Sequence, residues 1–582
     1  MFNRMGRSGG GRKGAFLAMA GLLASTLIAA PSGARADTTE ELLDQLKAKG
    51  ILTKGEYSKL KERHAREKAA LKGPAVAGAP SGGNGRYVTA LDKGIGVRIP
   101  GQTIVTKDNG VVTVGDVDVK LTGALVFYGM ESFKANYKGS ANELGNYGVP
   151  NGGANPYANY PGTTAYGPYA RNYGVLGGVL NGQSSYNNSN SIRAGLLPSN
   201  VVLSLATNQM GWDLGFTVGA YFGGNNVDPG AFNANSGGSP VGVGTSGIDL
   251  RQVFGTIGTP EIGTFKIGRD LGLFASDAIL NDFALVGVGT PAGNAAPSNT
   301  TLGRIGLGYV YADWLPQITY TTPTWNGFAL SVAMMTPLNT LNSTGDSPGA
   351  YGYPANVVYS PYVGFSSATI TGQDMPMFQG RLKYVGQLSP DVKLTAWTSG
   401  IYQQHRSEYG DAVVAGYSPV NGFLLTTPGE KFSSVGVDGG MRVDWGGFSV
   451  AGYGYWGSGL GTTGLFFAAF SPNGSARKSS GYYAEAQYTF GSSPYVPGFL
   501  SGDRFTIGGS YGQSFLSATT YDWTQPYSPY LLKSNSSAIG FVRYKVTDWA
   551  AIQVEFINTK SINQSGGSIT SNALAGGTTF FF

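Results

Sequence analysis

The stretch that decides the fold is residues 435–456, which read VGVDGGMRVDWGGFSVAGYGYW. On both sides of the Gly446-Gly447 pair, apolar residues or glycines alternate with polar or small residues. One face carries Val435, Val437, Gly439, Met441, Val443 and Trp445, and then Phe448, Val450, Gly452, Gly454 and Trp456. The other face carries Gly436, Asp438, Gly440, Arg442 and Asp444, and then Ser449, Tyr453 and Tyr455. A period of two is that of a β-strand and not of a helix. We therefore predict two antiparallel strands with one face toward lipid and the other toward water.

The same unit repeats from about residue 116 to residue 582. Each alternating segment of about ten residues is followed in turn by a tight turn or by a long loop, as in transmembrane barrels. The predicted strands start near residues 117, 190, 213, 248, 263, 303, 327, 378, 391, 433, 447, 480, 503, 535, 549 and 571. The longest loops, near 131–190, 224–247, 271–302, 337–377, 403–432 and 458–479, then fall on one side. We predict an all-β, antiparallel transmembrane barrel of about sixteen strands, with both ends on the periplasmic side.

The composition supports a barrel and argues against a soluble enzyme. Charged residues make up 13% of the 582 residues, whereas a soluble protein carries about 25%. No apolar run is long enough to suggest a helical membrane protein, and only helices or closed barrels satisfy their backbone groups in lipid. The chain has no cysteine, so we expect no disulfides.

The N-terminus resembles a cleavable export signal. Basic residues precede the apolar stretch 15–30, and Ala34-Arg35-Ala36 supplies a small-x-small cleavage site before Asp37. A membrane anchor is the alternative. Removing residues 1–36 takes away five of the 40 basic residues and none of the 34 acidic ones, which leaves 35 against 34. This balance gives no argument for nucleic-acid binding.

Residues 37–72 form the one stretch that we predict to be helical. Thr38 with Glu41 and Thr53 with Glu56 have capping-box spacing, and Gly50 separates the two helices. Such a segment could be a periplasmic coiled coil that aids oligomerisation or contacts peptidoglycan, or a loose amphipathic helix. We predict that residues 73–115 form a linker and an extended segment, and that the barrel spans 116–582.

The C-terminal residues read as a last strand with an aromatic end. Leu574, Gly576, Thr578, Phe580 and Phe582 share one face. A terminal aromatic is what outer-membrane barrel-assembly machinery recognises, so we expect Phe582 to contact it; the alternative is an ordinary apolar strand.

Residues 251–336 resemble the trimeric porins of Gram-negative bacteria. The matching stretches are Arg251-Gln252-Val253-Phe254, Gly263-Thr264-Phe265-Lys266-Ile267-Gly268-Arg269-Asp270, Tyr320-Thr321-Thr322-Pro323 and Gly327-Phe328-Ala329-Leu330. The resemblance implies a homotrimer in outer-membrane lipid and lipopolysaccharide, a fifth strand that ends at the Gly-Arg motif, and a third loop that folds into the pore. The N-terminal helices are similar to the coiled-coil prefix of certain porins that prefer phosphate or dicarboxylates.

In that family, wall arginines face carboxylates on the inward loop. Arg269 matches the arginine after the fifth strand and Arg193 the one early in the second strand, whereas Thr321 stands where a third is expected. Asp277 and Asp282 lie on the predicted loop, but the apolar residues 283–289 replace the acidic cluster deeper in the family's loop. The candidate constriction residues are Arg193, Lys266, Arg269, Asp270, Asp277 and Asp282.

We therefore expect a passive, water-filled outer-membrane channel for small hydrophilic solutes and ions. Alternation also points Lys120, Arg381, Lys383 and Lys393 inward, against Asp118, Asp438 and Glu555, which suggests weak anion selectivity. These charges could instead pair with each other or solvate the lumen. Two further functions stay open, a substrate-selective channel for phosphate or dicarboxylates and a barrel that anchors the envelope.

Signatures of an enzyme are weak. Residues 459–464 fit GxGxxG, but they follow a strand and open no helix. His64 and His405, the two histidines of the chain, are too few for a zinc triad. One lies on the predicted charged helix and the other in a predicted loop, so we expect no Ser-His-Asp set either. We predict no catalytic residue, no cofactor and no metal.

Overall fold

The computed structural model describes most of the predicted barrel. The described residues are 111–138, 189–222, 248–290, 300–340, 367–409, 428–491, 502–525 and 528–582, together with 86–87, 104–106, 175, 177–180, 411, 413–418, 422–425, 497 and 500. The predicted signal peptide (1–36) and helical segment (37–72) lie outside them.

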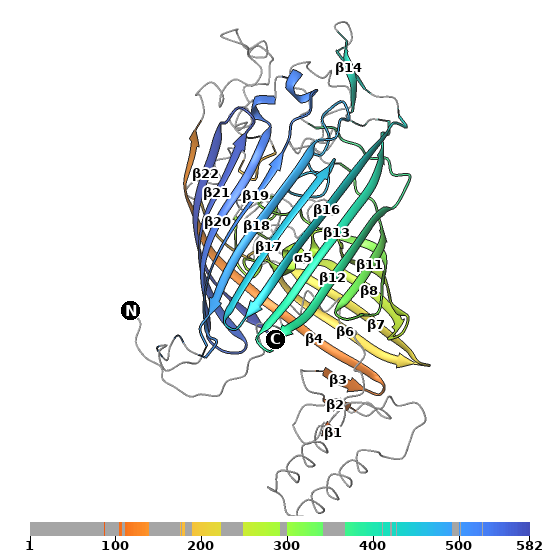
Figure 1. Ribbon diagram of the computed structural model, residues 1–582, viewed down its shortest axis with the longest axis vertical. Coiled ribbons are helices and arrows are strands. Elements are labelled where there is room, and N and C mark those ends of the chain that lie inside the picture. Colours follow the sequence, from red (N-terminus) through yellow and green to blue (C-terminus); the bar gives the residue numbers. More distant parts are fainter. Residues whose placement is uncertain are drawn as a thin grey trace, which may run out of the picture.

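Sixteen strands form one closed antiparallel barrel (Figure 1). Each strand pairs with the next one along the chain, and β22 pairs with β4 to complete the ring. The barrel strands are β4 (Val117–Lys138), β6 (Ser199–Gln209), β7 (Trp212–Phe222), β8 (Ile248–Thr259), β9 (Gly263–Leu271), β10 (Trp314–Thr321), β11 (Phe328–Met335), β12 (Met377–Ser389), β13 (Val392–Arg406), β16 (Lys431–Trp445), β17 (Phe448–Ser458), β18 (Lys478–Thr489), β19 (Phe505–Leu516), β20 (Leu532–Lys545), β21 (Ala550–Asn563) and β22 (Ser568–Phe581). The predicted fold class is confirmed.

Short elements accompany the barrel. Strands β1 (Arg86–Tyr87), β2 (Ile104–Thr106) and β3 (Val111–Val114) pair in sequence and join the lower end of β4, while β5 (Ser189–Arg193) pairs with its upper part. Strands β14 (Val414–Ser418) and β15 (Gly422–Leu425) form a hairpin in a long loop. The helices of the described residues are α5 (Ser276–Asn281), η3 (Asp522–Thr524) and η4 (Ser528–Tyr530).

The hairpin 435–456 folds as its alternation predicts. Trp445 pairs with Phe448 across the Gly446-Gly447 turn. Val437 is 53% exposed on the outer face, whereas the neighbouring Asp438 is 5% exposed inside the barrel. The outer face elsewhere also carries exposed apolar side chains, including Val450, Phe556 and Leu574, which suits contact with lipid. None of the helices in the described residues is long and apolar enough to cross a membrane.

Two predicted strand starts differ from the structure. The segment predicted to start near 190 is divided, because β5 ends at Arg193 and β6 starts at Ser199. The strand predicted near 303 is wrong, since β10 starts only at Trp314. Gly306 and Gly308 have φ values of 75° and 147°, which take the backbone out of a regular strand even though the sequence there alternates.

The strand ends that short turns join and the strand ends that long connections join lie at opposite ends of the barrel, as predicted (Figure 1). Two long loops matter for the interior. The third loop (residues 272–313) connects β9 to β10, and the sixth loop (residues 459–477) connects β17 to β18.

A charge on the outer face should destabilise the barrel in lipid. Val437 lies near the middle of the fifteen-residue strand β16. Val437→Arg should lower the free energy of unfolding by about 2–4 kcal/mol, the cost of placing a cation on the lipid face near the bilayer midplane. Urea unfolding in lipid vesicles measures this, with Val437→Ala as the control at the same site. Equal stability of the two variants would contradict the assignment of this face to lipid.

Candidate functional site: the constriction inside the barrel

The third loop folds into the barrel, as predicted. It leaves the wall after β9, the fifth barrel strand, and the N–H of Gly272 donates to the carbonyl of Asp313 (3.0 Å) where the loop returns. Its helix α5 lies within the ring of strands (Figure 1), and Tyr483 of β18 donates its hydroxyl to the carbonyl of Ala278 (2.8 Å). The loop therefore narrows the lumen beside the wall formed by β12 to β22.

Asp277 of α5 binds two cations of the wall. Its carboxylate lies 3.2 Å from Nη1 of Arg381 and 2.5 Å from Nζ of Lys383, both on β12. Asp277 is fully buried, while Lys383 keeps 16% of its side chain exposed. Burial raises the pKa of Asp277, but Lys383 and Arg381 outweigh it and hold that pKa below its ordinary value. Asp277 thus stays ionised and offsets part of the positive charge of β12.

Wall carboxylates hold the backbone of the third loop. Three buried carboxylates, one each on β16, β18 and β21, accept hydrogen bonds from backbone N–H groups of the loop. These bonds are Ala275 to Asp438 (2.9 Å), Phe283 to Glu485 (2.9 Å), and Val288 and Gly289 to Glu555 (2.9 and 3.0 Å). A buried loop needs such partners because unpaired N–H groups are costly. Asp438 and Glu555 point inward, as alternation predicts, but they are bound to the loop backbone.

Asp282 lies in a second buried polar cluster. Its Oδ1 accepts from the N–H of Ala284 (2.8 Å) and its Oδ2 from the hydroxyl of Tyr309 (3.3 Å). Burial raises the pKa of Asp282, and the charge of nearby Arg304 partly opposes this.

Sequence reasoning missed Arg304, which is fully buried and donates to the hydroxyl of Ser510 (2.6 Å). An arginine among glycines in residues 302–308 could have been a signal for a loop inside the barrel. The alternation of that stretch was interpreted as a strand instead.

Lys266 and Asp270 of β9 pair with each other. Nζ of Lys266 lies 2.5 Å from Oδ2 of Asp270, whose Oδ1 accepts from Nε2 of Gln252 (3.0 Å). Both side chains belong to the lumen side of β9, because Phe265 and Ile267 are exposed on the outer side.

Arg269 lies next to this pair but approaches a different carboxylate. Its position pairs with Val253 of β8 and Pro316 of β10, and its Nη2 lies 3.9 Å from Oδ1 of Asp249. Its side chain is 28% exposed. Arg269 alternates with Lys266 and Asp270, and its register partner Val253 is exposed on the outer side, so Arg269 does not share their lumen face. It lies near the base of the third loop, beside Asp249, and not opposite Asp277, which is bound to β12.

Arg193 contacts the returning limb of the third loop, which we define as residues 300–313. It ends β5, is fully buried, and Nη2 donates to the carbonyl of Thr300. The six predicted site residues thus all lie in or against the third loop or the strand that leads into it. Among the six, Lys266 and Asp270 form an ion pair with each other; the others contact separate partners and do not form one ring.

Water-accessible charges on the lumen side are mostly basic. Within the described strands, charged side chains that point inward and are not buried are Lys120, Lys266, Lys383, Lys393, Arg442 and Lys545, against Asp118, Asp213 and Asp444. Arg442 pairs with Asp444 (2.8 Å) and lies 5.2 Å from the ring centre of Phe283 on the third loop. The described lumen therefore has an excess of accessible positive charge.

Sixteen antiparallel strands close into a ring, and the loop after the fifth strand folds inside. This is the fold of the Gram-negative outer-membrane porins. A barrel with this apolar exterior and polar interior lies in an outer membrane.

Comparison with known proteins gives structural likeness at low sequence identity. No protein-family model matches the chain, and no curated protein matches it. The outer membrane channel DcaP of Acinetobacter baumannii is similar at 12% identity and a TM-score of 0.48, over 80% of this chain and 97% of that chain. OmpF of Salmonella typhi (11% identity, TM-score 0.40, 80% and 98% covered) and OprB of Pseudomonas putida (11%, 0.40, 80% and 94%) are also similar. All three TM-scores are below 0.5, so the fold stands on the strand pairing described above and not on these likenesses.

Removing the charge of Asp277 should make the lumen more positive. In Asp277→Asn, the charges of Arg381 and Lys383 lose their carboxylate partner. We expect the reversal potential in a salt gradient across a planar bilayer to shift toward anions. The double variant Asp277→Asn/Lys383→Gln should return it toward the wild-type value. A shift toward cations in the single variant would contradict this charge assignment.

Proposed function

We propose that the protein is a passive channel for small hydrophilic solutes and ions. The observation that carries this proposal is the closed barrel with an apolar exterior and a charged interior, narrowed by the inserted third loop. Such an arrangement selects by width and by the field at its narrowest section.

We propose further that the channel prefers anions weakly. The accessible basic side chains support this, since Asp438, Glu485 and Glu555 are occupied by the third loop. In this proposal Arg193, Lys266, Arg269, Asp270, Asp277 and Asp282 shape the constriction. Near the third loop, Lys266 and Lys383 contribute, because 11% and 16% of their side chains stay exposed although each is paired with a carboxylate.

One observation favours the second candidate, a substrate-selective anion channel. Five of the six residues of α5, from Ser276 to Leu280, are buried, and consecutive residues of a helix face different sides. In a wide diffusion pore, the free side of this loop would be in water, so the burial supports a narrow path. Saturation of the current by phosphate or by a dicarboxylate such as succinate would favour this candidate over general diffusion.

We propose a homotrimer from the porin resemblance, with residues 37–72 as a periplasmic oligomerisation segment or a peptidoglycan anchor. Recognition of Phe582 by the assembly machinery and contact with lipopolysaccharide belong to the same proposal. In the barrel, Phe582 and Gly123 exchange backbone hydrogen bonds of 3.0 and 3.1 Å, and the Phe582 side chain is 40% exposed. An unheated gel should show a high-mass band that boiling collapses; a single low-mass band before boiling would count against the trimer.

Planar-bilayer recordings with reversal potentials test the proposed function. The wild-type protein should form steady pores with a reversal potential on the anion side. Lys383→Gln removes a water-accessible cation, and we expect it to move the reversal potential toward cations. Arg269→Ala tests the arginine taken from the family resemblance, and an unchanged reversal potential would remove Arg269 from the proposal. Absence of pore current for the folded wild-type protein would overturn the channel function.

A further inference from the structure

The sixth loop also enters the barrel, although sequence analysis expected only the third loop to do so. Leu460 is fully buried over the inner face of β16 and β17. A Cβ built on Gly436 or Gly457 would lie only 3.0 or 2.7 Å from Cδ2 of Leu460, so glycine at both positions makes room for this side chain. Residues 459–464, which fit a chance nucleotide-binding pattern, are the inward limb of this loop.

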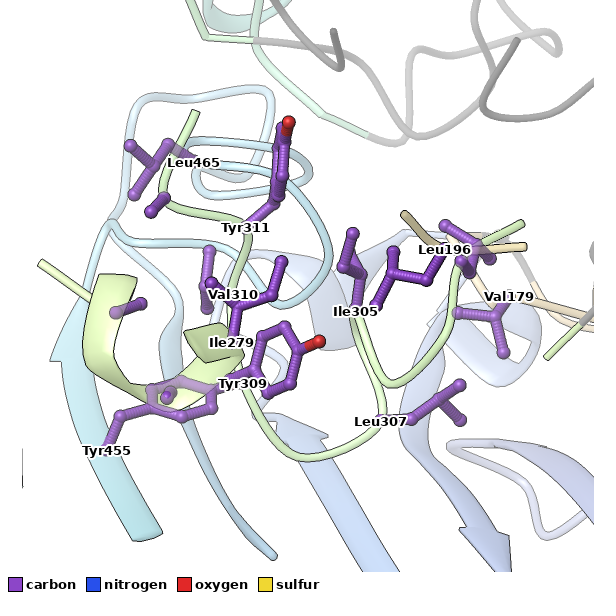
Figure 2. Packing of buried hydrophobic residues seen from close by; sticks show 14 of the residues in the cluster. Val179, Leu196, Ile279, Ile305, Leu307, Tyr309, Val310, Tyr311, Tyr455 and Leu465 are labelled. Carbon is purple, nitrogen blue, oxygen red and sulfur yellow. The ribbon is translucent and has the colours of Figure 1, made fainter. Parts of the chain in front are cut away.

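The inward limb contacts the returning limb of the third loop. The N–H of Tyr311 donates to the carbonyl of Thr463 (2.9 Å), and Tyr311 forms a β-bridge with Gly464. Gly306 of the returning limb also packs against Thr463, because a Cβ built on Gly306 would be 2.7 Å from Oγ1 of Thr463. Figure 2 shows Leu465 and Tyr311 in the same apolar cluster as Tyr309 and Ile279. The two loops therefore form one packed unit inside the barrel.

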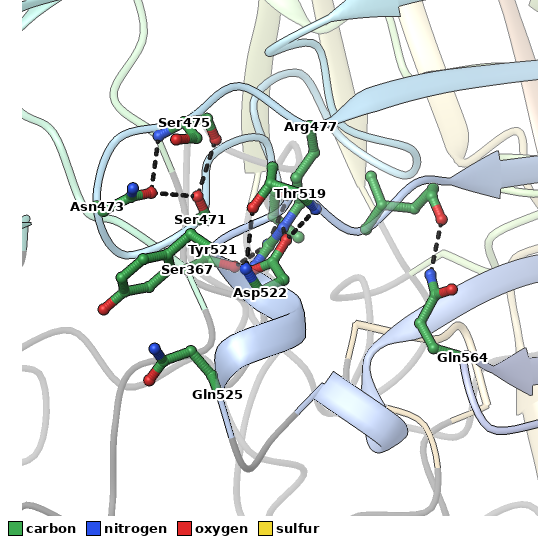
Figure 3. A network of polar contacts seen from close by, with 12 residues as sticks. Ser367, Ser471, Asn473, Ser475, Arg477, Thr519, Tyr521, Asp522, Gln525 and Gln564 are labelled. Atoms are coloured by element: carbon green, nitrogen blue, oxygen red, sulfur yellow. Dashed lines mark hydrogen bonds and ion pairs between the residues drawn. The ribbon is translucent and has the colours of Figure 1, made fainter.

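The far end of the sixth loop is fixed to other loops by a buried ion pair. Arg477 donates from Nε and Nη2 to both oxygens of Asp522 (2.9 and 2.7 Å), and both side chains are fully buried. Nη1 of Arg477 also donates to the hydroxyl of Ser367 (2.8 Å), as Figure 3 shows. Breaking one side of a buried pair is strongly unfavourable, so this end has little freedom to move.

The middle of the sixth loop holds two residues in an unfavourable backbone conformation. Phe466 and Ala468 have φ values of 64° and 55°, a region that residues other than glycine rarely adopt, and both are buried. The ring of Phe466 packs edge-on against His405 of β13, with ring centres 4.7 Å apart. Such strain persists only where surrounding contacts determine it, and it concentrates at functional sites.

We infer that the sixth loop is a second constriction element. By binding Tyr311 and packing against Gly306, it holds the returning limb of the third loop in place and limits the current through the pore. This inference rests on the proposed channel function, because it assigns a role in conduction.

The contact between the two loops can be tested without any current. The chain has no cysteine, so introduced thiols are the only ones present. A Cβ built on Gly306 lies 3.2 Å from Cβ of Thr463, close to the spacing of a disulfide. Gly306→Cys/Thr463→Cys should form a cross-link, seen as a band shift on a non-reducing gel that reductant abolishes. Each single variant controls for folding, which matters for Gly306 because its φ is 75°. A folded double variant without a cross-link would overturn the contact and the inference.

The role in conduction is tested with Phe466→Ala, which removes the ring held by His405. We expect a higher single-channel conductance and more transitions between current levels than in the wild type. Trp325→Ala, in the exposed turn between β10 and β11 at the other end of the barrel, is the control and should leave both unchanged. Leu465→Ala is a second variant if Phe466→Ala does not fold, and gel mobility before and after heating reports folding.

The outcomes separate the inference from the proposed function. Wild-type conductance in folded Phe466→Ala and Leu465→Ala would overturn the inference while leaving the channel function intact. A folded wild-type protein that carries no current would overturn the channel function, and the role in conduction with it. The cross-link would then still report whether the two loops touch.

Discussion

The pairing of β22 with β4 is the constraint on which the rest of the structure depends. In lipid, an open sheet edge would leave its N–H and C=O groups without partners, so the first and last barrel strands must meet. The ladder extends from Ser568 opposite Lys138 to Phe581 opposite Ala124, and the terminal Phe582 adds backbone bonds to Gly123. Once the ring is closed, alternation divides every strand into a lipid side and a lumen side.

Closure also creates an interior in which inserted backbone needs partners. The third loop obtains them from side chains of the wall, chiefly the carboxylates on β16, β18 and β21. The carboxylates that hold the third loop in place are thereby also removed from the water-accessible charge of the lumen. The three carboxylates that hold the loop are occupied and buried, whereas several lysines and Arg442 keep contact with water. The same contacts that hold the loop therefore leave a lumen biased toward positive charge.

The sixth loop extends this arrangement. It lies over the inner wall, binds the returning limb of the third loop through Tyr311, and is fixed at its far end by Arg477 and Asp522. The position of the constriction then depends on contacts between segments more than 150 residues apart in the chain. A narrow interior built from two loops is more suited to discrimination between solutes than one built from a single loop, because more of its boundary is fixed.

Sequence alone determined the barrel, since a period of two with turn residues between segments reports which face each side chain takes. The predictions of the hairpin 435–456 and of the last strand, β22, were correct for this reason. The resemblance around Gly268-Arg269 placed the third loop. Tertiary structure decided the partners: Asp277 with Lys383, Glu555 with the loop backbone, and Thr463 with Tyr311. Alternation carries no information on depth in the barrel or on which segment packs inside it. An inserted glycine-rich loop such as 302–308 can therefore alternate like a strand, and only the positive φ angles of its glycines show the difference.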